Sequence, residues 1–151
     1  WTSKAEMGQH KSICYKNLIP IFKLSNISFI DLEYKNSEED KKDIYQITGN
    51  KIYRIKEIDY YKNILGVSSI INACDLVITC SNVNAHISGA LGKKTFLLLP
   101  LGKGRLLNWS SENKVSIWYP SVSIFQQENP IDWKTPINKI KKELLKFIEN
   151  Y

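Results

Sequence analysis

Apolar and polar positions follow one another in blocks that predict strands and helices in turn. An uninterrupted apolar run at 76–80 gives way to small polar residues and then, at 85–91, to helical spacing that ends at Gly92. This predicts a buried parallel strand, a tight loop and a helix. Similar blocks predict helices within 13–24, from Ser37 to Gly49, around 67–73 and over 135–151, and strands at 27–32, 51–55, 95–99 and 121–126.

Strands that alternate with helices through short connections are typical of βαβ units around a parallel sheet. We therefore predict one α/β domain over residues 1–151, with a Rossmann-like parallel sheet flanked by helices on both faces. Ligands of such sheets bind at the carboxyl ends of the strands, which directs attention to the loop after 76–80. The chain begins with Trp1 rather than Met, and we expect it to be a fragment of a longer protein.

Composition and charge narrow the class of partner. No run of about 18 apolar residues is present, and nothing at the N-terminus resembles a signal peptide, so we expect no membrane span. The net charge of +6 comes mainly from lysines that are mixed with acidic residues, and the only arginines are Arg54 and Arg105. This favours a solvated lysine-rich surface over a nucleic-acid partner.

The cysteines are few and scattered. Cys14, Cys74 and Cys80 have neither CxxC spacing nor a nearby histidine cluster, so they predict no disulfide framework and no metal site. We interpret Cys74 and Cys80 as buried reduced thiols, which fits a cytoplasmic protein.

The start of the helix after Cys80 is a candidate anion site. Its first backbone N–H groups lack partners within the helix and the helix dipole is positive there, which favours phosphate. Ser81, Asn82 and Asn84 add side-chain donors, and His86 lies in the first turn. The plainer alternative is that Ser81 and Asn82 only cap the helix and His86 only packs.

Two further groups are candidates for the same ligand. Glu33 follows the strand at 27–32 and suits a ribose hydroxyl, and Lys103, in a loop with glycine hinges, could reach a diphosphate unless it is only solvated. No GxGxxG follows the first strand and no GxxxxGK[ST] occurs, so neither a dinucleotide fingerprint nor a P-loop is indicated. Gly89 fits close helix packing and Gly92 a helix end.

The run ACDLVITCSNVNAHISGALGKKTFLLLP resembles bacterial glycosyltransferases of the ADP-heptose:lipopolysaccharide heptosyltransferase type. It is closer still to the domain that follows tetratricopeptide repeats in many bacterial proteins, which has a pattern like DLVIsvDTxxAHLAGALGKPvwvLLP. The WYP turn at 118–120, the DW pair at 132–133 and the opening WTSK also match. The resemblance covers essentially the whole chain and is loosest between 34 and 65.

The resemblance implies one half of a GT-B fold, in which two Rossmann-like domains face each other across a cleft. This chain would be the C-terminal half, which binds a nucleotide diphosphate sugar without an essential metal or other cofactor. The missing N-terminal domain would supply the catalytic base for transfer to a glycan or protein acceptor. Matching positions would place the nucleoside near Glu33 and Tyr34, and the diphosphate among Ser81, Asn82, Val83, Asn84, Ala85 and His86, approached by Thr2, Ser3 and Lys4.

One position departs from the pattern, because Ser81 replaces the usual acidic residue. The change fits either a different sugar or a domain that binds without turnover. We therefore keep three hypotheses: a glycosyltransferase donor-binding domain that is inactive alone, a non-catalytic interaction module with a vestigial anion pocket, and another doubly wound enzyme such as a nucleotide-sugar epimerase. The absent GxGxxG counts against the third.

Overall fold

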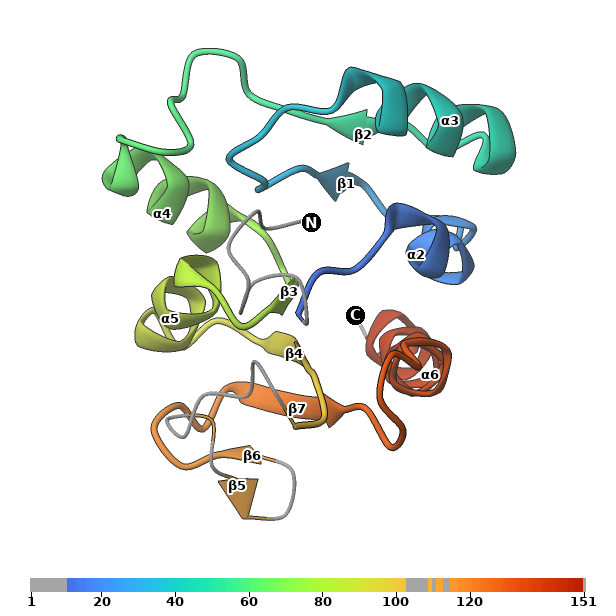
Figure 1. Cartoon of the computed structure of the whole chain (residues 1–151). Coiled ribbons are helices and arrows are strands. Elements are labelled where there is room, and N and C mark those ends of the chain that lie inside the picture. The colour runs from blue at the N-terminus through green and yellow to red at the C-terminus, as the bar shows by residue number, and fades with distance from the viewer. Residues whose placement is uncertain (1–10, 103–108, 110, 113–114, 151) are drawn as a thin grey trace.

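Helices and strands alternate as far as residue 99, and three more strands and a helix follow, in a computed structural model that describes residues 11–102, 109, 111–112 and 115–150 (Figure 1). The helices fall close to the expected positions, the strand at 95–99 has the expected bounds, and the other predicted strands are shorter than expected. In chain order the elements are α2 (Tyr15–Phe22), β1 (Phe29–Ile30), α3 (Glu38–Thr48), β2 (Ile52–Tyr53), α4 (Ile64–Ala73), β3 (Val77–Cys80), α5 (Val83–Ala90), β4 (Thr95–Leu99), β5 (Ser111–Glu112), β6 (Val115–Ser116), β7 (Val122–Gln126) and α6 (Lys134–Glu149).

Two sheets share the strands. β1 pairs with β2 in parallel, and a second sheet has the order β3-β4-β7-β6-β5. In it β3, β4 and β7 are parallel, whereas β5 and β6 form an antiparallel edge. The expected α/β fold with parallel strands and flanking helices is therefore present. The antiparallel pair of β5 and β6 was not expected, because strands of two residues are too short to show an alternating pattern.

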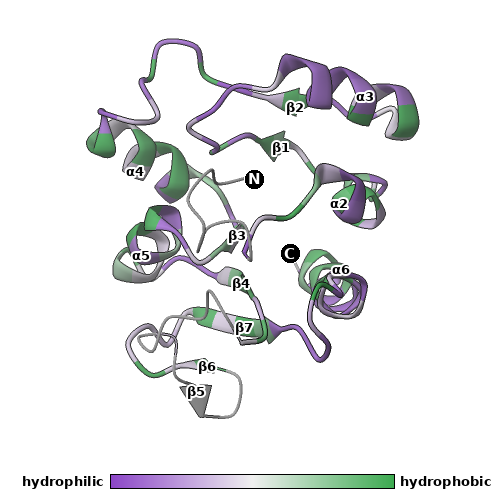
Figure 2. Cartoon of the chain, viewed as in Figure 1, coloured by the Kyte–Doolittle hydropathy of each residue, from purple (hydrophilic) through white to green (hydrophobic). Residues whose placement is uncertain are grey.

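Helices cover both sides of these sheets (Figure 1). α2 packs against α3 and α6 on one side, and α4 packs against α5 on the other. β4 lies between the two layers, and all five of its side chains are buried. Figure 2 shows α4 and β4 as mainly hydrophobic and α3 as mainly hydrophilic, as expected for a helix with one buried residue, Ile44.

Local signals account for the helix ends. Ser37 caps α3 by accepting a hydrogen bond from the Asp40 N–H at 3.3 Å, and the first turn of the helix is acidic. α3 ends where Gly49 adopts φ +74°, a left-handed conformation that favours glycine. Both ends of this helix confirm the sequence prediction. Among the described residues, every helix falls short of the length and apolar character needed to cross a membrane.

Candidate functional site

The loop between β3 and α5 is held by its own side chains. Asn82 is the N-cap of α5, and its Oδ1 accepts hydrogen bonds from the Ala85 N–H at 3.3 Å and from the Thr79 hydroxyl at 3.1 Å. These bonds fix the first turn of α5 relative to the carboxyl end of β3. Asn82 therefore caps the helix, which the plainer alternative also expects, and Val83 and Asn84 are the first two residues of α5.

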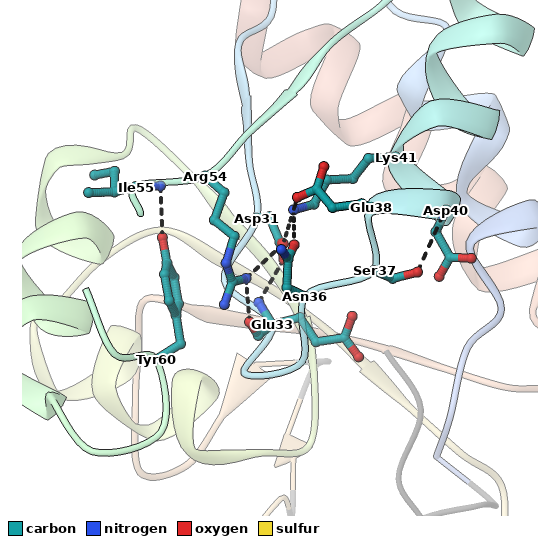
Figure 3. Close-up of polar contacts among 10 residues, drawn as sticks. All are labelled: Asp31, Glu33, Asn36, Ser37, Glu38, Asp40, Lys41, Arg54, Ile55 and Tyr60. Atoms are coloured by element: carbon teal, nitrogen blue, oxygen red, sulfur yellow. Dashed lines mark hydrogen bonds and ion pairs between the residues drawn. The ribbon is translucent and has the colours of Figure 1, made fainter. Parts of the chain in front are cut away.

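A buried ion cluster fixes the loop that leaves β1 (Figure 3). The carboxylate of Asp31 accepts a hydrogen bond from the Glu33 N–H at 2.8 Å and contacts the Arg54 guanidinium at 2.8 Å and the Lys41 amine at 3.1 Å. Arg54 also donates to the Glu33 carbonyl at 2.6 Å, and its guanidinium stacks 3.8 Å from the centre of the Tyr60 ring. The loop is thus held from both sides by charged groups.

Sequence reasoning missed the role of Asp31 and Arg54. The available signal was an acidic residue inside an otherwise apolar strand, since a buried carboxylate requires a cation. The identity of that cation was not visible, because Arg54 lies 23 residues further along the chain.

One hydrogen bond brings the two loops together. The Asn84 Nδ2 donates to the Leu32 carbonyl at 3.0 Å, so the first turn of α5 lies beside the loop that leaves β1. Both loops border a cavity of about 1000 Å³ that extends between β1 and β3. Six of the residues predicted from the sequence line this cavity: Glu33, Tyr34, Ser81, Asn82, Val83 and Asn84. We call the end of the cavity bordered by these six residues the carboxyl-end mouth.

Aromatic and polar groups surround this mouth. The Tyr34 ring lies 6.2 Å from the Tyr61 ring, centre to centre; Tyr34 is half exposed and Tyr61 is largely exposed. Ser81 is buried and accepts a hydrogen bond from the Trp109 indole at 2.8 Å, which leaves its own hydroxyl proton available for donation.

Ala85 and His86 lie away from the cavity. The Ala85 side chain is fully buried in a core cluster with Trp109, so only its backbone faces the helix start. The His86 ring lies 4.7 Å from the Trp109 ring, and its Nδ1 is 3.3 Å from the Tyr119 hydroxyl. The structure therefore puts His86 in the packing position that the sequence left as an alternative. Thr2, Ser3, Lys4 and Lys103 lie outside the described residues.

The two thiols that line the cavity favour the protonated form. Burial raises the pKa of the Cys80 thiol, and of Cys74 in the same way, which disfavours the reactive thiolate. Within the part of the chain that the structure describes, no group of three or more His, Cys, Asp or Glu residues is arranged to hold a metal ion. The chemistry available at the mouth is hydrogen bonding, stacking and the dipole of α5.

Comparison with known proteins gives one distant relative. No family model matches the chain, and no solved structure matches it. A curated protein called FlbA, from Caulobacter vibrioides, is 27% identical over 128 residues, which cover 85% of this chain and 21% of FlbA. The chain thus spans about a fifth of the length of the curated relative it matches.

Proposed function

We propose that this chain is the donor-binding domain of a glycosyltransferase and binds a nucleotide diphosphate sugar at the carboxyl-end mouth. The observation that carries the proposal is that six residues from two distant sequence segments, 33–34 and 81–84, line one cavity. A cleft at the carboxyl ends of parallel strands is the usual ligand position in open α/β sheets.

Each part of the ligand has a matching feature at the mouth. The dipole of α5 and the first-turn N–H groups of Val83 and Asn84 favour a diphosphate. The exposed Tyr34 ring offers a surface for the base, and the Glu33 carboxylate is an acceptor for a ribose hydroxyl. In this proposal the domain stabilises the leaving nucleotide electrostatically, and a domain outside this chain provides the base and the glycan or protein acceptor.

Titration calorimetry with ADP-, UDP-, GDP- and CDP-sugars tests the proposal. We expect one nucleotide class to bind with a dissociation constant of about micromolar order. Val83→Glu places a negative charge at the exposed first turn of α5, without removing a cap, and should weaken binding at least about tenfold by repelling the diphosphate. Val83→Gln is the matched neutral control and should weaken binding much less than Val83→Glu, because it adds no charge.

The outcome separates the hypotheses kept above. Binding of one nucleotide class that Val83→Glu weakens much more than Val83→Gln does supports the donor site. If no nucleotide binds while circular dichroism shows an intact fold, the proposal fails, and the non-catalytic interaction module becomes the better description.

A further inference from the structure

β1 and β3 are facing edge strands of two separate sheets. Figure 1 shows the strands in the spatial order β2, β1, β3, β4, β7, and the interval between β1 and β3 separates the two sheets. Within the described residues, β1 pairs only with β2, and β3 has β4 as its one neighbour. The cavity of about 1000 Å³ occupies this interval and is lined by residues of both strands.

Backbone groups of β3 point toward the cavity. The Val77 N–H donates to the Lys94 carbonyl at 2.9 Å, so the backbone groups of Val77 face the β4 side. Because these groups alternate sides along a parallel strand, those of Ile78 and Cys80 face away from β4 and toward the cavity.

Backbone groups of β1 also point toward the cavity, from its opposite side. The Asp31 N–H donates to the Tyr53 carbonyl at 2.8 Å, so the backbone groups of Ile30 and Leu32 face away from β2. The Leu32 carbonyl confirms this direction, because it accepts the Asn84 side chain across the mouth. That bond also shows that β1 and β3 point the same way, since it joins their carboxyl ends.

The position of α2 indicates what belongs between these strands. α2 precedes β1 and packs against α3, the helix that connects β1 to β2. When right-handed crossovers place successive helices on the same face of a parallel sheet, each new strand is added on the same side of the strand before it. A strand that leads into α2 would therefore lie beside β1 on the side away from β2, which is the position of the cavity.

The residues just before α2 do not encode such a strand. The segment WTSKAEMGQHKS, residues 1–12, contains no apolar run, whereas a strand covered by helices on both faces requires one. We propose that the interval between β1 and β3 is the slot for one further β-strand, parallel to both and apolar on both faces, supplied by the polypeptide that precedes Trp1 in the full-length protein. This strand joins the two sheets into one and leaves the carboxyl-end mouth open.

Amide hydrogen exchange measured by NMR tests the slot directly. We compare the 151-residue chain with the same chain extended by the roughly 15 residues that the proposal places before Trp1, enough for one strand and a turn. The extension should slow exchange at Ile30, Ile78 and Cys80 at least about tenfold more than at Leu97, which lies inside β4 between two paired neighbours.

A matched control removes the apolar character of the strand but keeps its length. An extension in which every apolar residue is replaced by serine should leave exchange at Ile30, Ile78 and Cys80 as it is in the 151-residue chain, because serine does not bury in an apolar slot.

Two results would overturn the proposal. One is an extended chain in which the three amides exchange as fast as in the 151-residue chain. The other is a 151-residue chain that sediments as a dimer and already protects them, since a second copy would then fill the slot. Neither measurement involves nucleotide, so its result is independent of the donor-site proposal.

Discussion

At the scale of single residues, the loop beside the mouth depends on one buried carboxylate. The Asp31 side chain is 4% exposed, and two cations from different elements neutralise it. Removing one partner from such a cluster leaves buried charge and hydrogen-bonding groups unsatisfied, which costs more than the loss of an exposed ion pair. Arg54 has the larger role of its two cations, because it also binds the Glu33 carbonyl.

We predict that Arg54→Met lowers the free energy of unfolding by about 1–3 kcal/mol, with Lys41 still in place to limit the loss. Lys146→Met is the matched control, because Lys146 forms an exposed ion pair with Glu143 and its removal should leave the free energy of unfolding close to that of the unmodified chain. Urea unfolding monitored by circular dichroism measures both values. Equal losses in the two variants would contradict the role given to Arg54.

Tyr15 provides a second test at residue scale. Its hydroxyl donates to the Asp43 carboxylate at 2.7 Å, and chiefly this hydrogen bond raises the pKa of Tyr15 from 10.0 to about 12. The protonated form is favoured in the folded state, so this contribution to stability is complete below pH 10.0 and is lost as pH rises toward about 12.

The Asp43→Asn variant should lower the pKa of Tyr15 toward 10.0, because it removes the charged acceptor and its repulsion of the phenolate. An NMR titration of the Tyr15 ring resonances measures the shift. An unchanged Tyr15 titration would show that Asp43 does not set its pKa.

At the scale of elements, α5 is fixed by close contact with the turn before β7. An ideal Cβ added to Gly89 would lie 2.5 Å from Cγ of the Tyr119 ring, a distance that real side chains do not adopt. This confirms the close packing predicted for Gly89. The same ring contacts His86, so one aromatic side chain positions two residues of the helix.

We expect Gly89→Ala to destabilise the fold by about 1–3 kcal/mol through overpacking, although alanine favours helices by about 1 kcal/mol over glycine. In a Tyr119→Leu background the same substitution should cost at least about 1 kcal/mol less, because the ring that it meets is gone. Thermal and urea unfolding of the four proteins complete this double-mutant cycle. A cost that is independent of Tyr119 would refute the contact.

At the scale of the whole molecule, the β1–β2 sheet is attached through helix packing and the hydrogen bond from Asn84 to Leu32. Elements with few buried contacts open before the rest of a protein. The Asp31 N–H, which pairs with Tyr53, should therefore exchange faster than the Leu97 N–H in the interior strand β4.

Asn84→Asp should widen this difference about two- to tenfold, because a carboxylate cannot donate to the Leu32 carbonyl. Asn82→Asp is the matched control: it adds the same charge to the same helix start and keeps the capping acceptor. Hydrogen exchange at Asp31 should respond to the first substitution and not to the second. The same response to both would assign the effect to charge rather than to the hydrogen bond.

The sequence alone determined the features that depend on neighbouring residues. Helix positions, the capped start at Ser37, the end at Gly49 and the polar loop after Cys80 follow from apolar periodicity and from side chains that bond within three or four positions. Glu33, Ser81, Asn82 and Asn84 were also visible, because each follows a strand where ligands of α/β sheets bind. Tyr34 and Val83 were implied only by the family resemblance.

Only the tertiary structure decided which of these residues meet. Hydrogen bonds join Asp31 to Arg54, Ser81 to Trp109 and Asn84 to Leu32, which lie 23, 28 and 52 positions apart in the sequence. Such contacts depend on packing between elements, which leaves no periodic trace in the sequence. For the same reason the structure, and not the sequence, revealed two sheets with an interval between them, since strand order depends on pairing between distant segments.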